Sequence, residues 1–278
     1  MPSLEMNISI TRRVTLAVVC LATAMLMLDI AVVNTALSDI SRDLHTGLSG
    51  LQWVIDAYTL ALATVVLSAG SLADRLGRRR LFLGGLALFT VSSAVCAAAN
   101  SIAMLDAARA VQGIGAAVMF AVSLALLANA FPGARERAGA LAAYGATIGA
   151  AFAIGPLVGG ALTSGLGWRW IFIVNIPLGL IALAATLARV EESRDPKARS
   201  IDWIGQVLLG GGLFLLVLAL LRGNDQGWGN TAILAEFAGA AAFLAAFAFA
   251  EQRVKEPMLP LAFFRNRSFA AAQLGAFA

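Results

Sequence analysis

The sequence has little of what soluble enzymes and redox proteins depend on. Only 13% of its 278 residues are charged, against ~25% in soluble domains, while 60% are hydrophobic. Two cysteines and one histidine are too few for an all-protein zinc site or a haem pocket. We therefore expect neither a metal nor a cofactor. The same composition excludes a soluble enzyme, a secreted disulfide scaffold and a transmembrane β-barrel.

Long apolar runs are what the sequence has in abundance. Their length is close to the ~20 residues that a helix needs to cross the hydrocarbon core, and the pattern predicts an all-α integral membrane protein. The complete runs are Val14–Leu37, Leu51–Leu72, Leu81–Ala99, Met104–Phe131, Ala138–Leu162, Ile171–Ala188, Ile201–Leu221 and Ala232–Ala250. A ninth run opens at Phe269, and the sequence stops within it at Ala278, so we expect a truncated chain.

The basic residues are divided unevenly between the two sets of loops. With the N-terminus inside, the inner loops hold sixteen of the twenty Lys and Arg residues and the outer loops three, while Arg109 lies within a run. The positive-inside rule then predicts a multi-pass protein of the plasma (inner) membrane with a cytoplasmic N-terminus. Because the net charge of +4 is scattered over short loops, we expect no nucleic-acid partner. Frequent arginine, alanine and glycine indicate a G+C-rich genome. We expect a bacterial protein.

Ionisable residues inside apolar runs are candidates for function, since inserting each one costs ~2.5–3.5 kcal/mol. Asp29, Asp56 and Arg109 all fall in the outer third of their runs at ~1.5 Å rise per residue. We predict that Asp29 faces Arg109 and that their pairing changes as Asp29 binds and releases a proton. A static ion pair that only fixes helix register is the alternative.

Glycines form a second candidate region in the fifth run. The set is Gly145, Gly149, Gly155, Pro156, Gly159 and Gly160. Small residues at four-residue spacing allow close helix contact, and the proline removes a backbone donor and permits a bend. This pattern favours a moving helix interface. Tight packing between static helices explains the spacing equally well.

The segment after the second run forms a third candidate region. It reads Gly70-Ser71-Leu72-Ala73-Asp74-Arg75-Leu76-Gly77-Arg78-Arg79-Arg80. Asp74 among arginines can pair locally and can accept hydrogen bonds from the N-terminus of a neighbouring helix, which would make a breakable cytoplasmic latch. The flanking glycines favour a shaped turn. An anchor that only sets membrane topology is the alternative.

Four segments resemble motifs of the major facilitator superfamily, and within it of the fourteen-helix drug:proton antiporters. Gly70–Arg80 resembles the signature between helices two and three, and Arg109–Gly115 resembles the fourth-helix motif. Gly149–Gly160 resembles the fifth-helix antiporter motif of exporters, and Leu28–Leu37 is similar to the first-helix motif of the fourteen-helix branch. Tyr58, Trp168-Arg169-Trp170, Asn175 and Pro177 match supporting positions around helices two and six.

The resemblance implies an N-terminal six-helix bundle over residues 1–190. It further implies a linker with two additional transmembrane helices over 191–254, and the truncated start of a C-terminal bundle over 255–278. The missing part of that second bundle would be needed for a complete transporter. The implied function is proton-coupled export of lipophilic or cationic drugs and antibiotics by alternating access, with protons, a small-molecule drug and membrane lipid as partners.

The resemblance also implies roles for individual residues. Asp29 and Asp56 would handle protons or cations, and Arg109 would modulate them. Gln112 and Asn34 lie in the matching motifs and belong to the same proton-coupling and substrate site. The latch would comprise Gly70, Asp74, Arg75, Gly77 and Arg78, and the antiporter motif Gly149, Gly155, Pro156, Gly159 and Gly160.

Two other functions stay open at this point. A metabolite symporter of the same superfamily would differ in the direction of transport, and the Gly-Pro pattern of the fifth run speaks against it. A truncated, non-transporting membrane scaffold or regulator would explain the missing second bundle. An enzyme is not expected, because the sequence has no metal signature and no Ser/His catalytic set.

Overall fold

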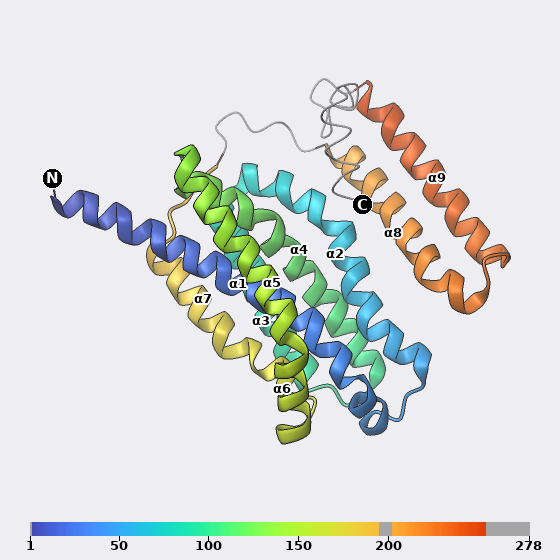
Figure 1. Cartoon of the computed structure of the whole chain (residues 1–278). Coiled ribbons are helices and arrows are strands. Elements are labelled where there is room, and N and C mark those ends of the chain that lie inside the picture. Colours follow the sequence, from blue (N-terminus) through green and yellow to red (C-terminus); the bar gives the residue numbers. More distant parts are fainter. Residues whose placement is uncertain (1, 195–201, 254–278) are drawn as a thin grey trace. The chain divides into compact units, whose positions relative to one another are not determined.

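A computed structural model of the chain describes residues 2–194 and 202–253, with side chains from Ile10 onward (Figure 1). The described residues are helical and contain no strand, which confirms the all-α prediction. The chain divides into two compact units, one ending at Ala198 and the other starting at Arg199. Each unit is described by itself below.

The first unit contains seven helices among its described residues. They are α1 (Pro2–Asp43), α2 (Leu48–Leu76), α3 (Arg78–Ala97), α4 (Ile102–Ala130), α5 (Ala134–Leu166), α6 (Trp170–Ile173) and α7 (Asn175–Arg189). The second unit contains α8 (Trp203–Gln226) and α9 (Thr231–Glu251). Among the described residues eight helical segments are long and apolar enough to cross a membrane, with Trp170–Arg189 counting as one, so the eight complete apolar runs are confirmed as helices of spanning length. The run that opens at Phe269 lies outside the described residues.

The helices of the first unit pack as a bundle around α1 and α4. α4 packs along both α2 and α3, α5 packs along α1, and α7 packs along α3 and α1. Close approach is possible because α4 carries glycines at its contacts. A Cβ at Gly113 would lie 2.3 Å from the carbonyl oxygen of Tyr58 on α2, and one at Gly115 would lie 2.7 Å from the backbone nitrogen of Phe89 on α3.

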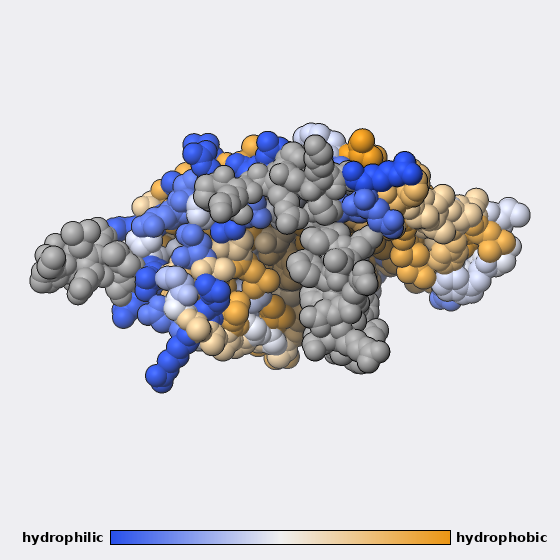
Figure 2. All heavy atoms as spheres, turned by 90° about the horizontal axis from the view of Figure 1, so that it is seen from above, coloured by the Kyte–Doolittle hydropathy of each residue, from blue (hydrophilic) through white to orange (hydrophobic). Residues whose placement is uncertain are grey.

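The two ends of the bundle differ in composition. At one end, where α2 stops and α5 starts, Arg12 of α1 pairs with Glu136 of α5, and Arg78 donates its backbone N–H to Ser193 after α7. Hydrophilic side chains gather in patches on this side of the molecule (Figure 2). At the other end, Arg169 bridges Asp43 of α1 and the carbonyl of Ala99. The arginine-rich loops of the first unit therefore lie together at one end.

The sixth span is interrupted between α6 and α7. Pro177 has no backbone N–H to donate to the carbonyl of Ile173 four residues earlier, and its ring crowds that carbonyl. The helix therefore stops at Ile173 and restarts at Asn175, although Val174 keeps helical angles of φ −61° and ψ −28°. This break places Asn175 at the first position of α7.

The described part of the second unit is an antiparallel pair of helices with its own packing. Gly211 and Gly212 of α8 lie against Phe243 and Leu244 of α9, and a Cβ at either glycine would approach those side chains to within 3 Å. Asp202 caps the start of α8 by accepting the backbone N–H of Gly205 at 2.8 Å. An ion pair joins Arg222 to Glu236 across the two helices.

Candidate functional site

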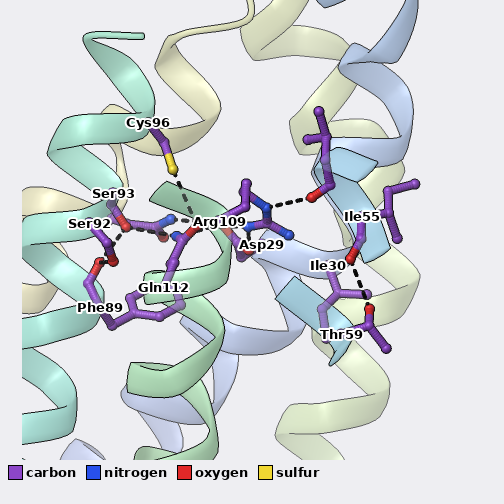
Figure 3. Close-up of polar contacts among 12 residues, drawn as sticks. Asp29, Ile30, Ile55, Thr59, Phe89, Ser92, Ser93, Cys96, Arg109 and Gln112 are labelled. Atoms are coloured by element: carbon purple, nitrogen blue, oxygen red, sulfur yellow. Dashed lines mark hydrogen bonds and ion pairs between the residues drawn. The ribbon is translucent and has the colours of Figure 1, made fainter. Parts of the chain in front are cut away.

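A buried ion pair lies in the interior of the first unit (Figure 3). Arg109 of α4 donates from Nη1 to Oδ2 of Asp29 on α1 at 2.5 Å. The side chains are only 2% and 0% exposed, respectively. Gln112, one turn further along α4, donates from Nε2 to Asp29 Oδ1 at 3.1 Å and accepts from Arg109 Nη1 at 2.7 Å. The three side chains thus form one closed hydrogen-bonded unit.

Three more polar side chains complete the first ring of contacts. Ser93 of α3 accepts from Gln112 Nε2 at 2.9 Å, and Cys96 places its Sγ 3.6 Å from Gln112 Oε1 (Figure 3). Asn175 of α7 donates from Nδ2 to Asp29 Oδ1 at 3.3 Å. Asp29 therefore accepts from two residues of α4 and one of α7, so the carboxylate connects three of the six spans.

The guanidinium of Arg109 is held on its other side by α2. Its Nε donates to the carbonyl oxygen of Val54 at 3.0 Å, and its Cζ lies 4.2 Å from the ring centroid of Tyr58. The ring of Phe172, on α6, lies 5.9 Å away. A cation over an aromatic face is attracted to the ring quadrupole, more strongly where water is absent. Arg109 therefore has favourable contacts that do not depend on Asp29.

This arrangement has a direct chemical consequence. Taking one partner of a buried ion pair away leaves an uncompensated charge in the interior. Protonating Asp29 does this without any mutation, and the freed arginine then has Val54, Gln112 and the Tyr58 ring as its remaining partners. Protonation of Asp29 would thus change which contacts hold α1 and α4 together. Among the described residues no cluster of three or more His, Cys, Asp or Glu side chains could hold a metal ion.

Two predicted members of this site lie outside it. Val54 and Tyr58 are four residues apart and share the face of α2 that meets Arg109, whereas Asp56, midway between them, lies on the opposite face and is half-buried. Asn34 is exposed and donates to the carbonyl of Ile30 at 3.1 Å, within its own helix. Of the five proton-coupling and substrate residues predicted, the structure brings together Asp29, Arg109 and Gln112.

The segment Gly70–Arg80 is not a loop, which corrects the expected shaped turn between two glycines. α2 continues through Asp74 and Arg75 to Leu76, and α3 starts at Arg78, so Gly77 is the only residue between them. Gly77 has φ +108°, a conformation that side chains disfavour. Gly70 lies inside α2, and a Cβ there would meet nothing within 4 Å. Only Gly77 has a conformational reason to be glycine.

Asp74 pairs locally instead of reaching a helix terminus in the described part of the chain. Its Oδ1 accepts from Nε and Nη2 of Arg78 at 3.0 and 2.7 Å. The N-terminus of α3 is occupied by Glu192, which accepts from the backbone N–H groups of Arg79 and Arg80 at 3.0 and 3.2 Å. A Cβ at Gly77 would lie 2.7 Å from Glu192 Oε1. Glu192 lies in the segment after α7, so these bonds connect that segment to the start of α3.

The glycines of α5 fall on two faces. A Cβ at Gly155 would lie 2.4 Å from the Cβ of Ala31, and one at Gly159 would lie 3.0 Å from the Cα of Val32, so both allow α5 to approach α1. Gly145, Gly149 and Gly160 have nothing within 4 Å at the same position. Pro156 is exposed and lies inside a continuous α5. Close packing against α1 therefore explains two of the predicted positions.

Sequence reasoning did not assign Ser93, Asn175 or Glu192 to a site. Ser93 and Asn175 carried a usable signal, because a polar side chain inside an apolar run needs a hydrogen-bond partner. Both are buried in the structure, at 0% and 2% exposure. Glu192 carried no such signal, because carboxylates are common in charged segments that connect helices.

A bundle of apolar helices that buries an ion pair at its centre is typical of membrane transport proteins. The chain belongs to the Major Facilitator Superfamily, whose family model matches residues 19–264. Membership of this transporter family confirms the prediction that the protein is not an enzyme.

Relatives of the chain carry names that refer to drug resistance. Multidrug resistance protein Stp of Mycobacterium tuberculosis is 42% identical over 262 residues, covering 94% of this chain and 49% of the relative. The methylenomycin A resistance protein of Bacillus subtilis is 38% identical over 275 residues, covering 99% of this chain and 59% of the relative. The chain therefore spans about half the length of the curated relatives it matches.

Solved structures show the same fold. The human organic anion transporter MFSD10 (TETRAN) superposes with a TM-score of 0.58 at 18% identity, over 95% of this chain and 68% of that one. A peptide transporter POT superposes with a TM-score of 0.61 at 13% identity, over 84% of this chain and 51% of that one. At such identities the likeness concerns the fold alone.

Proposed function

We propose that this chain forms the N-terminal bundle of a proton-coupled exporter of lipophilic or cationic drugs or antibiotics. The names of its relatives support the substrate class. The observation that carries proton coupling is the carboxylate of Asp29, which is fully buried and held by three donors from α4 and α7. A buried carboxylate that joins several helices can convert protonation into movement of those helices.

In the proposed cycle Asp29 alternates between two conditions. While it is charged, Arg109 neutralises it and the spans that carry them stay together. When a proton arrives, the attraction is lost, and Val54 and Tyr58 of α2 remain as partners of Arg109. Alternating access then requires that the two conditions favour opposite orientations of the bundles around a central drug site.

The proposal places the arginine-rich end of the first unit in the cytoplasm, with the N-terminus on that side. It also assigns the open face of α5 to contact with a second bundle. Support comes from Gly145, Gly149 and Gly160, which have free space beside them in this chain, and from the greater length of the relatives. Asp74 and Arg78 act in the proposal as a latch that closes the cytoplasmic side.

The test is made in the protein expressed from its complete gene. Asp29→Asn keeps the size of the side chain but cannot alternate between charged and neutral forms. In everted membrane vesicles energised with a proton gradient, wild-type protein should accumulate a fluorescent cationic drug, and Asp29→Asn should not. Thr186→Val on α7 is the matched control, because Thr186 is buried but donates only to Ala182 of its own helix.

The same vesicles separate export from the two rival functions. A metabolite symporter would move its substrate in the direction of proton flow, and a scaffold would move none. Normal, gradient-dependent drug accumulation by Asp29→Asn at equal expression would reject the proton-coupling role of this carboxylate.

A further inference from the structure

We propose that Asn175 is a positioning residue that reads the protonation state of Asp29 and passes it to the sixth span. This inference rests on the proposed function and deepens it, because it names how the proton site is connected to a helix that can move. The observations are the hydrogen bond from Asn175 to Asp29, the burial of both, and the break in the helix at which Asn175 lies.

Asn175 differs from the two other partners of Asp29 in what it can offer. A guanidinium only donates, so Arg109 can bond the charged carboxylate or the carbonyl oxygen of the acid, but it cannot accept a hydrogen bond from the O–H of the acid. An amide carries an NH2 donor and a carbonyl acceptor, and can therefore donate to a carboxylate or, reversed, accept from a carboxylic acid. Gln112 and Asn175 both carry an amide, but their surroundings differ.

Gln112 is fixed in one direction by its neighbours. Its carbonyl accepts from Arg109 and lies against Cys96, while its NH2 donates to both Asp29 and Ser93. Reversing this amide would break the bonds to Arg109 and Ser93 together. In the described structure Asn175 makes a single side-chain hydrogen bond, the 3.3 Å bond to Asp29. Asn175 is thus the amide that can reverse when Asp29 takes up a proton.

Asn175 lies where its helix bends most easily, so reversal of its amide can change the angle between α6 and α7. Asn175 begins α7 directly after the turn at Val174, where Pro177 has removed the backbone hydrogen bond to Ile173. A helix that lacks this bond bends more easily there than elsewhere. Gly179, one turn further, lies so close to α3 that a Cβ would be 2.0 Å from Thr90 Oγ1. From Gly179 onward α7 packs closely against α3, so we expect bending to occur at the interruption around Val174.

The other titratable groups around Asp29 do not provide this link. α4 supplies Arg109, α2 supplies Tyr58 beneath the guanidinium, and α3 supplies Cys96 behind Gln112. Asp56 of α2 lies on the face turned away from Arg109. Tyr144 of α5 lies near Thr23 and Cys20, more than one turn along α1 from Asp29. In α6 and α7, Asn175 is the side chain that bonds the carboxylate.

The local part of the proposal is tested by infrared pH-difference spectroscopy on the protein from its complete gene, purified and reconstituted in lipid. The carboxylic C=O band that disappears in Asp29→Asn reports protonation of Asp29. Asn175→Leu keeps the branching and the number of side-chain heavy atoms but has no amide. It should move the midpoint of this band to higher pH by about one unit, because a hydrogen bond to a charged group is stronger than one to a neutral group. The band itself should move to higher wavenumber, since the acid has lost its acceptor.

A second variant guards against a general packing effect. Asn175→Asp is isosteric and places another carboxylate beside Asp29, where two like charges cannot both persist, so the midpoint should rise further. Thr186→Val should leave both band and midpoint unchanged. Midpoints within roughly 0.2 pH unit of wild type in both Asn175 variants would overturn the proposal.

Transmission to the sixth span is tested by hydrogen exchange of the backbone around the break, residues 173–178. Asp29→Asn imitates the protonated acid and should speed exchange there. In the Asn175→Leu background, Asp29→Asn should add nothing further, which is the non-additivity expected of coupled residues. A full additive effect in the double variant would reject Asn175 as the link. Neither measurement uses a drug, so failure of drug transport by the wild-type protein would reject the proposed function without deciding this inference.

Discussion

Two ion pairs of the first unit have the same chemistry and opposite surroundings. Asp29 and Arg109 meet inside the bundle from α1 and α4, eighty residues apart, with side chains 0% and 2% exposed. Asp74 and Arg78 meet at the end of the bundle, four residues apart, with side chains 43% and 21% exposed. The first pair is also tied into hydrogen bonds from Gln112 and Asn175, whereas the second is a local contact across Gly77.

The difference teaches that burial, not the presence of a salt bridge, decides what such a pair does. An exposed pair contributes ~0–1 kcal/mol, since water screens it and two long side chains lose freedom. Breaking a buried pair costs ~3–5 kcal/mol, because the remaining charge has no solvent. Breaking the interior pair should therefore change stability and structure more than breaking the end pair.

The largest effect is expected at the interior pair. Arg109→Met removes the cation, its bond to Val54 and its contact with Tyr58, and should lower the free energy of unfolding by about 3–5 kcal/mol. Denaturant titration in detergent micelles measures this. The double variant Asp29→Asn with Arg109→Met leaves no charge behind and should recover part of the loss. A double variant less stable than Arg109→Met alone would show that the unpaired charge is not the cause.

The next effect is expected at Gly77, the single residue between α2 and α3. Gly77→Ala forces a side chain into φ +108° and against the Glu192 carboxylate, and should destabilise by about 1–3 kcal/mol. Gly70→Ala is the matched control, because it fills open space inside α2 and should stabilise by about 0.5–1 kcal/mol. Equal effects of the two variants would mean that the turn is not strained by a side chain.

A smaller loss is expected from Glu192→Gln. The carboxylate faces the N-terminus of α3, and such a charge contributes about 0.3–1 kcal/mol. The amide keeps one acceptor, so the loss should stay within that range and shrink as salt is added. Exposed Glu191, the neighbouring residue, supplies the control variant Glu191→Gln. Identical salt dependence of the two variants would contradict the capping role.

The smallest effect on stability is expected at the end pair. Asp74→Asn should change the free energy of unfolding by no more than about 0.5 kcal/mol, because the pair is local and partly hydrated. If Asp74 also acts as the proposed latch, Asp74→Ala in the complete protein should slow transport while membrane insertion stays normal. Wild-type transport rates at equal expression would leave the pair as a topology anchor only.

The sequence predicted the helices well because insertion into a bilayer constrains composition strongly. The eight apolar runs were expected to be helices, because a single segment in lipid can pair all its backbone N–H and C=O groups only as a helix. It also predicted that Asp29 and Arg109 would meet, because two opposite charges at one depth are costly apart. The same argument could not separate Asp56 from this pair, since depth does not specify which face of a helix a residue occupies.

Other parts of the site could not be predicted from the sequence pattern. The expected loop around Asp74 is mostly helix because helical propensity continues to Leu76, and only the φ of Gly77 ends it. Glu192 is separated from Arg79 by 113 residues, and no local rule pairs an exposed carboxylate with a distant helix terminus. The bond from Asn175 to Asp29 spans 146 residues in the same way.

By itself, then, the sequence determined which of the described segments are helices long enough to cross a membrane, and where each charge lies along its helix. These properties follow from hydropathy and rise per residue, both of which are local. The tertiary structure alone decided rotation: that Val54 and Tyr58 face Arg109 while Asp56 does not, and that Asn175 reaches Asp29. Helix rotation is fixed by packing against several neighbours at once, and in an apolar span almost every face satisfies the bilayer equally well.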